Sequence, residues 1–383
     1  MEYYSEEEVG YLVNIAKQFN VIILRLPCKR RCLFCYLRQR GSLLKKNISQ
    51  SKFIPRKDYN KIIEALDYKK QIDFSTGDVL DYGFIYEFLD LLGKEQRRRK
   101  EHGRLIICST FGCFDEKKIG ILKRLKADIQ LSFITLDAKV KKNLMNGSWS
   151  EKQNELVKKV IRSGILTQIY VWYLGDLELL KKDLATLKSL MPKGHSALIS
   201  LNYPSSTRFS SKKMKQLSAR ALASWDKAVQ TFMEFPNNLP EIDRRIFVIK
   251  DLSKWPREGC FHQKREMQDF RDRIQRALGH LSENKTNLNK AAFITAESSY
   301  PYAKEVYPNL NWIKAPHKYF GGDITTCDLL TFADIEHAIK QNTEYTTYVL
   351  STGMVKSGRG IYDLMNVSKD DFAKRMRKNL VFA

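Results

Sequence analysis

Long apolar runs are missing from this sequence, since none approaches the ~20 residues that a helix needs to cross a bilayer. Internal repeats and low-complexity tracts are also missing. The first ten residues, MEYYSEEEVG, lack the basic and apolar regions of a signal peptide. The seven cysteines are odd in number and unevenly spread, which argues against a disulfide framework. We therefore expect a cytoplasmic globular protein without a membrane segment.

Acidic residues are the minority among the charged ones, with 43 Asp and Glu against 66 Lys and Arg and a formal net charge of +23. A charge of this sign admits an acidic partner such as nucleic acid. The basic residues are spread along the whole chain, however, and no RNA-binding signature accompanies them. A lysine-rich solvated surface explains the charge equally well. Nucleic acid is thus a partner that the sequence allows but does not favour.

An alternation of strand-like and helix-like stretches occupies residues 21–205. Six short apolar stretches are separated by amphipathic stretches of helical period. Strands that are apolar throughout and are separated by helices predict a parallel sheet under helical cover. Six units build either an open doubly wound sheet or a partial (β/α)6 barrel, and both bind ligands at the carboxyl ends of the strands. The six stretches are VIILRL, QIDFST, RLIICST, DIQLSFI, ILTQIYVWY and SALISLNY.

The rest of the chain has a different pattern. Residues 1–20 form an N-terminal extension. Residues 206–287 begin with a polar loop and continue into two long helical patterns, which we interpret as a helical region and a candidate lid over the barrel. Residues 288–383 contain a second, shorter alternation and are predicted to form a small α/β module.

Three of the seven cysteines lie close together in the stretch LPCKRRCLFCYLRQRG, with the spacing Cys28-x3-Cys32-x2-Cys35. Clustered thiols in a reducing compartment indicate metal binding or catalysis. A structural zinc ion would need a fourth protein ligand from elsewhere in the chain. An iron–sulfur cluster is the other interpretation, and three ligands would leave one iron of a [4Fe–4S] cluster open. The candidates for a fourth zinc ligand are Cys108, Cys113, Cys260 and His262.

The cysteine trio, with Phe34 before Cys35 and Tyr36 after it, resembles the signature of the radical S-adenosylmethionine (radical SAM) superfamily. The resemblance implies that the three thiolates hold a [4Fe–4S] cluster whose open iron binds S-adenosylmethionine (SAM). It implies that one electron, from a reductant such as flavodoxin or ferredoxin, splits SAM into methionine and a 5′-deoxyadenosyl radical. This radical abstracts a hydrogen atom from the substrate. The implied fold is the partial (β/α)6 TIM-like barrel, in agreement with the six predicted units.

Two further segments are similar to the superfamily. DFSTGDVLD follows the second predicted strand, where the family carries a Gly-Gly-Glu-like segment whose backbone meets the amino group of SAM. At this place the chain has Ser-Thr-Gly-Asp instead of Gly-Gly-Glu, so the segment matches by its position after the second strand. QLSFITLD, on the fourth strand, resembles a family pattern in which a serine lies near the cofactor. The resemblance implies cofactor-binding positions at Tyr36, Ser75, Thr76, Gly77, Asp78 and Ser132.

Within the superfamily, CLFCYLRQRG, STGD and LSFITLD are most similar to the spore photoproduct lyase branch. The lyase repairs a thymine dimer in DNA with a cysteine as hydrogen-atom donor, an activity that we do not transfer to this chain. Cys108, at the end of the third predicted strand, is the candidate for a catalytic cysteine. The alternative for Cys108 is a buried structural thiol.

The C-terminal module has a resemblance of its own, to a domain of unknown function that follows some radical SAM cores. NWIKAPHKYFGGDITTCDLLTFADIEHAI carries most of it, with His317 where that domain has an asparagine. GRGIYDLMNVSKDDF, with Asp363, resembles the end of the same domain. The matching positions of the first stretch are Tyr319, Phe320, Gly321, Gly322, Leu329, Leu330, Thr331, Asp334 and Ile335.

We therefore expect a radical SAM enzyme whose substrate is a small metabolite or a peptide rather than a nucleic acid. The alternatives are a radical SAM enzyme acting on nucleic acid and, from another class, a zinc-stabilised nucleic-acid-binding protein. Aromatic and polar residues near the strand ends are candidates for lining the substrate site, although the aromatic ones are equally explained by packing. They are Trp172, Tyr173, Tyr203, Asn202 and Asp137.

Overall fold

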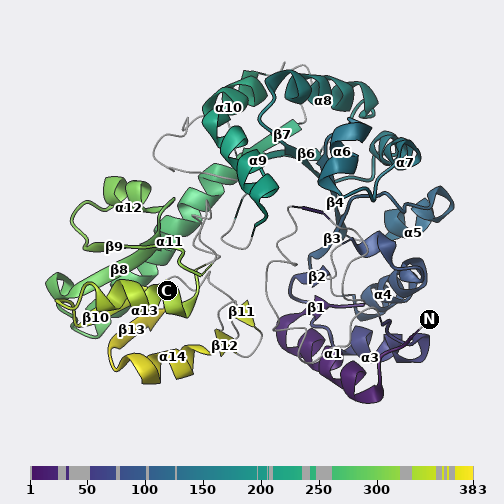
Figure 1. The fold of residues 1–383 in the computed structure, drawn as a ribbon. Coiled ribbons are helices and arrows are strands. Elements are labelled where there is room, and N and C mark those ends of the chain that lie inside the picture. The colour runs from purple at the N-terminus through teal and green to yellow at the C-terminus, as the bar shows by residue number, and fades with distance from the viewer. Residues whose placement is uncertain are drawn as a thin grey trace. The chain divides into compact units, whose positions relative to one another are not determined.

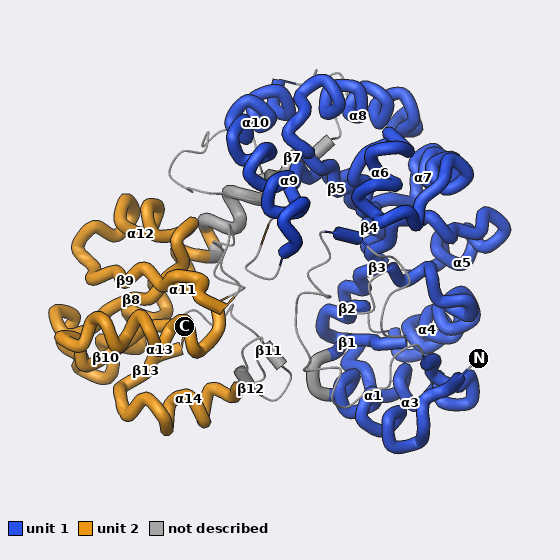
Figure 2. The backbone as a smooth tube through the Cα atoms, viewed as in Figure 1, with its two compact units in different colours: residues 1–204, 210–247 blue, residues 205–209, 248–383 orange. Residues whose placement is uncertain are grey.

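The computed structural model divides the chain into two compact units (Figure 2). Unit 1 comprises Met1–Pro204 and Ser210–Phe247, and unit 2 comprises Ser205–Phe209 and Val248–Ala383. No helix among the described residues is long and apolar enough to cross a membrane. The structure describes residues 2–24, 32–33, 52–74, 78–100, 103–125, 127–195, 197–204, 206, 210–234, 242–246, 261–319, 330–350, 356–357, 360–361 and 367–382.

Unit 1 is built on a seven-stranded sheet whose strands follow one another in chain order (Figure 1). All six neighbouring pairs are parallel, so the carboxyl ends of the strands lie along one edge. The strands are β1 (Val21–Ile22), β2 (Ile72–Phe74), β3 (Leu105–Ser109), β4 (Ala127–Ile134), β5 (Gln168–Trp172), β6 (Ala197–Asn202) and β7 (Ile242–Ile246).

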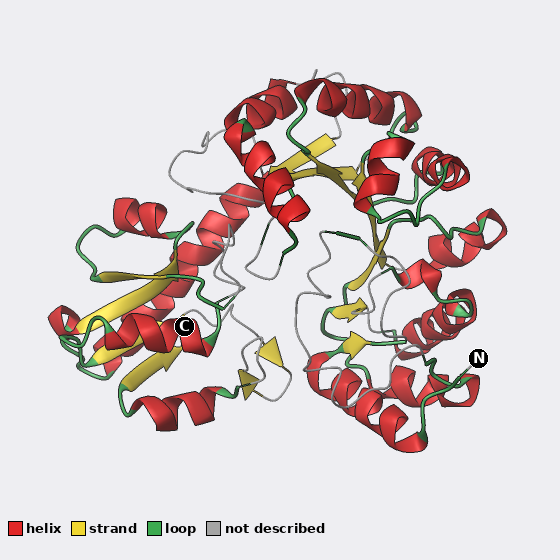
Figure 3. Ribbon diagram, in the orientation of Figure 1, coloured by secondary structure: helices red, strands yellow, loops and turns green. Residues whose placement is uncertain are grey.

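Helices cover one face of this sheet, and Figure 3 shows them along the outer side of the curved strands. Every second strand residue faces them, as the period of two requires. Ile107, Leu131, Ile169 and Val171 are accordingly no more than 1% exposed. The helices of unit 1 are α1 (Glu6–Phe19), α3 (Tyr59–Ala65), α4 (Ile85–Arg99), α5 (Ile119–Arg124), α6 (Ala138–Leu144), α7 (Glu151–Arg162), α8 (Leu177–Leu190), α9 (Lys212–Ala223) and α10 (Trp225–Glu234).

The predicted fold class is confirmed, since unit 1 is an α/β unit with a parallel sheet under helices and unit 2 adds a small sheet. The sheet differs from the expected six strands by a seventh, β7, which lies in the region 206–287 that we predicted to be helical. Its sequence, IDRRI, carries three charged residues and lacks the continuous apolar run of the other strands. Within 206–287, α9, α10 and β7 lie in unit 1, whereas α11 lies in unit 2.

Unit 2 contains a parallel four-stranded sheet in the order β13-β10-β8-β9. Alternate residues of β8 enter opposite apolar clusters: Ala291 and Phe293 face α11, and Ala292 and Ile294 face α13. The result is a sheet with helices on both faces. The elements are α11 (Phe261–Glu283), β8 (Ala291–Ala296), α12 (Tyr300–Val306), β9 (Trp312–Ala315), α13 (Phe332–Lys340), β10 (Thr347–Leu350), the hairpin β11 (Lys356–Ser357) and β12 (Gly360–Ile361), α14 (Lys369–Met376) and β13 (Asn379–Phe382).

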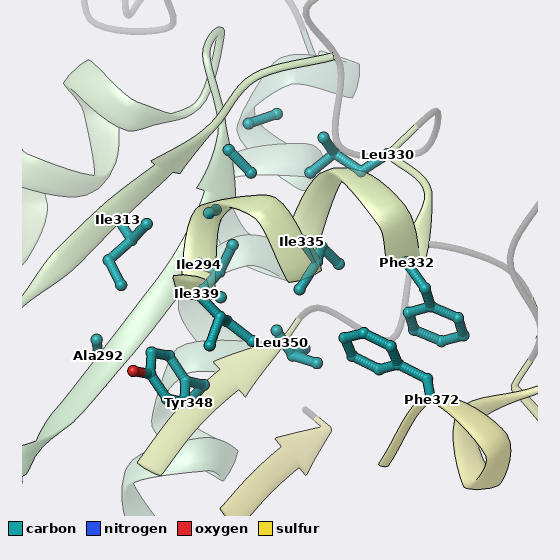
Figure 4. Close-up of a cluster of buried hydrophobic side chains, with 13 residues drawn as sticks. Ala292, Ile294, Ile313, Leu330, Phe332, Ile335, Ile339, Tyr348, Leu350 and Phe372 are labelled. Carbon is teal, nitrogen blue, oxygen red and sulfur yellow. The ribbon is translucent and has the colours of Figure 1, made fainter. Parts of the chain in front are cut away.

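The cluster on the α13 face shows how the end of the chain joins this module (Figure 4). Phe332 of α13 and Phe372 of α14 stack with ring centroids 4.4 Å apart and an interplanar angle of 8°. Both rings are at most 1% exposed. The sequence analysis did not predict α14 and β13, which complete one edge of the sheet.

Candidate active site

The cysteine loop is described only at Cys32 and Leu33. The backbone N–H of Leu33 donates a hydrogen bond to the carbonyl oxygen of Leu144, 2.8 Å away. Because Leu144 is the last residue of α6, this bond holds the loop beside the segment that follows β4. Cys32 is partly exposed. Cys28, Cys35 and Tyr36 lie outside the described residues.

Asp78 is the described member of the predicted segment 75–78, and the other three lie outside the described residues. Its carboxylate is 8% exposed and accepts hydrogen bonds from the hydroxyls of Ser109 and Thr110. The Ser109 hydroxyl also accepts a bond from the backbone N–H of Phe111 at 2.9 Å. The turn after β2 is therefore fastened to the turn after β3, at the carboxyl edge of the sheet.

Two cysteines lie near this junction in different surroundings. Cys108 is on β3 and is partly exposed on the sheet face. The surrounding protein removes most of the hydration of its thiol and raises the pKa to about 12, and the negative charge of Asp78 adds to the increase. Cys113 is exposed in the turn after β3, and its sulfur lies 2.8 Å from Oδ1 of Asp81. The part of the chain that the structure describes contains no group of three or more Cys, His, Asp or Glu side chains able to hold a metal ion.

Ser132 lies near the end of β4, just before an irregular turn. The register between β4 and β5 shifts between Ser132 and Ile134. Ile134 has φ of 63°, which is a strained conformation for a β-branched residue. Strain of this kind persists only where the surroundings hold the backbone in place.

A network of buried polar side chains holds this backbone in place. Oδ1 of Asp183, on α8, accepts a hydrogen bond from the backbone N–H of Leu136 at 3.0 Å. The Nζ of Lys141 donates to the carbonyl oxygen of Phe133 at 2.9 Å. Nδ2 of Asn154 donates to the carbonyl oxygen of Leu136 at 2.7 Å. Helices α6, α7 and α8 thus each contribute one side chain that fixes the backbone next to Ser132.

Within this network, Asp183 has a raised pKa. It is 3% exposed, and burial raises the pKa of its carboxyl to about 6 despite the opposing hydrogen bonds from Leu136 and Thr135. Asp137, which we considered as a substrate-orienting residue, instead caps α6, because its Oδ1 accepts the backbone N–H of Val140 at 2.9 Å.

Toward the carboxyl edge, the sheet face opposite the helices carries uncharged polar side chains on β3 to β6. Tyr170 donates a hydrogen bond from its hydroxyl to Oε1 of Gln130 at 3.1 Å. Nε2 of Gln168 donates to the hydroxyl of Ser200 at 2.9 Å. We call the set that shares this face the polar wall: Cys108, Gln130, Ser132, Gln168, Tyr170, Trp172, Ser200 and Asn202.

Gln130, Gln168 and Ser200 were not singled out in the sequence. A signal was present, because polar residues recur at every second position of otherwise apolar strands, as in Gln130 and Ser132. Single-strand patterns show such alternation, but only the register between strands shows that the polar positions form one surface.

Tyr173 and Tyr203 follow β5 and β6 and are packing residues. They are 1% and 3% exposed, and both rings pack on Trp225 of α10 at centroid distances of 6.2 and 5.0 Å. Trp172 differs, since it is partly exposed on the polar wall. Of the three aromatic candidates, Trp172 therefore remains for the substrate side.

Residues 27–178 match the model of the Radical SAM superfamily. This chain contains a radical SAM domain. The matched range includes the cysteine trio, Asp78, Cys108 and Ser132. No curated protein matches the chain.

Several solved structures resemble the chain at low identity. SuiB from Streptococcus suis, bound to the precursor peptide SuiA, is 19% identical with a TM-score of 0.40, and the match covers 63% of this chain and 52% of SuiB. The enzyme anSMEcpe with bound AdoMet and the Cp18Cys peptide is 13% identical with a TM-score of 0.37, covering 56% of this chain and 60% of that one. The chain thus spans about half the length of SuiB.

The radical SAM domain supports a [4Fe–4S] cluster and SAM as the cofactors. The donor set fits the cluster, since three closely spaced thiols suit an iron–sulfur site with one open iron. At Cys32 the thiol is partly exposed, as a ligand at a binding edge must be. Asp78, which follows β2, and Ser132, near the end of β4, both lie along the carboxyl edge of the sheet, with β3 between the two strands.

Proposed function

We propose that this chain is a radical SAM enzyme that abstracts a hydrogen atom from a small metabolite or a peptide. The match of residues 27–178, which includes the cysteine trio, carries the proposal. The bound cluster and SAM supply the chemistry, which is reductive cleavage of SAM to methionine and a hydrogen-abstracting 5′-deoxyadenosyl radical. The chain supplies the binding, the orientation and the exclusion of water around it.

The roles of the cofactor-binding residues are those that the resemblance to the superfamily implies. Cys28, Cys32 and Cys35 hold the cluster. The backbone of residues 75–78 receives the amino group of SAM, and Asp78 anchors that segment to the turn after β3 through Ser109 and Thr110. Tyr36 and Ser132 border the cofactor, with Ser132 held in place by the network around Asp183.

Cys108 is proposed as a catalytic thiol on the substrate side. Because burial raises the pKa of this thiol to about 12, it keeps its hydrogen at neutral pH. A protonated thiol can give a hydrogen atom to a carbon radical, whereas a thiolate would serve as a nucleophile. The surroundings of Cys108 therefore suit hydrogen-atom transfer better than covalent catalysis.

The remaining assignments are proposals of the same kind. A one-electron donor such as flavodoxin or ferredoxin is the expected partner, in the cytoplasm. The core is proposed to be nearest to the spore photoproduct lyase branch, and the C-terminal module to the domain of unknown function that follows some radical SAM cores. Nucleic acid is the alternative substrate, suggested by the charge of +23 and by the resemblance of the core to the lyase.

Anaerobic reconstitution tests the proposal. The wild-type protein should bind about four irons and four sulfides per chain and release 5′-deoxyadenosine from SAM under reductant. The triple variant Cys28→Ala, Cys32→Ala, Cys35→Ala should do neither. One zinc per chain without sulfide would instead support the zinc-stabilised nucleic-acid-binding protein, and 5′-deoxyadenosine release by the triple variant would refute the assignment of the ligands.

A further inference from the structure

We propose that the polar wall binds an amide edge of the substrate, meaning a planar uncharged group with an N–H beside a carbonyl, and that Asn202 is the residue that recognises it. The inference rests on the proposed function, because it assigns the substrate chemistry of the same site. It concerns residues of β4, β5 and β6 within unit 1.

Asn202 has an unsatisfied side chain. It is 8% exposed, and its Oδ1 is buried without a hydrogen-bond partner in the structure. Buried carbonyl oxygens without a donor are rare in native proteins, since water is lost and nothing replaces it. The backbone of Asn202 is fixed meanwhile, because its carbonyl oxygen accepts the N–H of Tyr173 at 2.7 Å. The missing donor is therefore expected from a ligand.

The position of Asn202 fits a ligand site. It is the last residue of β6, at the carboxyl edge where parallel α/β sheets bind their ligands. It is paired in register with Trp172 of β5, which is partly exposed on the same face. Neighbouring strands lie ~4.8 Å apart, so one planar group can contact the indole ring and reach the carboxamide with its edge.

The chemistry of the wall selects the class of group. A carboxamide presents an acceptor and a donor side by side, and its complement is a group that presents a donor and an acceptor in the same way. The eight residues of the polar wall are uncharged, and the charged Arg245 of the neighbouring strand β7 is paired in register with Ser200 rather than with Asn202. A neutral group therefore suits the part of the wall beside Trp172 and Asn202. A neutral amide edge presents a donor beside an acceptor and brings no charge to the wall.

The rest of the wall is preorganised for this purpose. Gln130 and Gln168 have the same carboxamide chemistry as Asn202, but each already bonds to a neighbouring strand, to Tyr170 and to Ser200. These bonds hold the side chains in place before a ligand arrives. Asn202 is thus the carboxamide of the wall whose oxygen is left for the ligand.

Pairs of probes that differ only in one N–H test the inference. The cyclic pair is 1-methyluracil and 1,3-dimethyluracil, and the open-chain pair is acetamide and N-methylacetamide, whose methyl group replaces the N–H on the carbonyl side. Radiolabelled probes are dialysed to equilibrium against the reconstituted enzyme in the presence of SAM. The variants are Asn202→Leu, of similar volume, and Asn143→Leu as the control on the exposed side of α6.

We expect at least one N–H probe to bind the wild type about tenfold more tightly than its methylated partner, as for one buried hydrogen bond. Asn143→Leu should keep this preference and Asn202→Leu should lose it. A preference within the cyclic pair indicates a nucleobase-like substrate, and a preference within the open-chain pair indicates a primary carboxamide such as the side chain of Asn or Gln in a peptide. Equal binding within both pairs, no binding of any probe, or an undiminished preference in Asn202→Leu would overturn the inference.

The same enzyme preparation shows whether a negative result concerns the role of Asn202 or the proposed function itself. Release of 5′-deoxyadenosine is measured on the wild type without any substrate. If it is released but no amide preference appears, the radical SAM assignment stands and the role of Asn202 is rejected. If it is not released, the proposed function itself fails.

Discussion

Lys141 and Phe133 are joined by a hydrogen bond from a fully buried ammonium group to a backbone carbonyl oxygen, 2.9 Å apart. Nζ also lies 4.0 Å from the ring centroid of Trp149. Burying an ammonium group is costly unless it is paired and hydrogen-bonded, so these contacts must outweigh its lost hydration. The carbonyl belongs to the residue after Ser132. The bond therefore connects the stability of α6 with the geometry of the predicted cofactor edge.

Lys141→Met should destabilise the protein, because it removes the donor and leaves the Phe133 carbonyl buried without its partner. Met has a similar length and keeps the apolar contacts with Trp149. We expect a loss of about 3 kcal/mol in the free energy of unfolding, measured by urea denaturation. The neighbouring Lys142 is exposed, and Lys142→Met is the matched control. A loss for Lys141→Met no larger than that of the control would show that the bond contributes nothing.

Asp183 should make stability depend on pH. Burial raises the pKa of its carboxyl to about 6, whereas the unfolded chain should have a value of ~3.9. The folded state therefore holds the proton more tightly, so the stability from this group is full below pH ~4 and is lost as pH rises through ~6. The difference is about 3 kcal/mol between the two limits.

Asp183→Asn removes this titration and keeps an oxygen for the N–H of Leu136. The difference in unfolding free energy between wild type and variant should therefore change by about 2 kcal/mol between pH 4 and pH 7, in favour of the variant at pH 7. Denaturation curves at both pH values measure it, and titrations shared by the two proteins cancel. A difference that does not vary with pH would contradict a raised pKa.

Thr110→Val tests whether the hydrogen bonds that hold Asp78 in place contribute to the affinity for SAM. The change preserves shape and removes one of the two hydroxyls that bond to Asp78. We expect about fivefold weaker SAM binding by the reconstituted enzyme, corresponding to one lost hydrogen bond of ~1 kcal/mol. Thr186→Val on α8 is the control, since its hydroxyl bonds only within its own helix, to the carbonyl oxygen of Lys182. Unchanged SAM affinity in Thr110→Val would show that this hydrogen bond to Asp78 does not contribute to cofactor binding.

The alternation of apolar strands and amphipathic helices was sufficient to predict six strands of unit 1, because each signal is local. β7 was missed since IDRRI has no such apolar run. Asp78 was found through a resemblance, but its partners Ser109 and Thr110 depend on two turns meeting in space. Lys141 and Asp183 were also missed. A charged residue on an amphipathic helix is normally predicted to be exposed, and these two are buried only because other helices pack over them.

Cys108 and Cys113 should differ in reactivity although they are five positions apart. A thiol of pKa about 12 has ~10⁻⁴ of its population as thiolate at pH 8, against ~0.2 for an unperturbed thiol. Because the thiolate is the nucleophile, iodoacetamide should modify Cys108 about a thousandfold more slowly than an ordinary exposed thiol. Cys113 is exposed and provides the comparison within the same chain.

The native protein is alkylated for set times at pH 8, and tandem mass spectrometry assigns each modification to Cys108 or Cys113, since both lie on the tryptic peptide LIICSTFGCFDEK. Cys113→Ser confirms which site carries the fast reaction, and alkylation after unfolding in urea should make Cys108 as reactive as the other thiols. A native rate that is slow at pH 8 and rises about tenfold per pH unit up to pH 10 shows that the fold keeps this thiol protonated, as a hydrogen-atom donor requires. Rapid native modification of Cys108 would mean that it is a thiolate or freely accessible, and its proposed catalytic role would have to be abandoned.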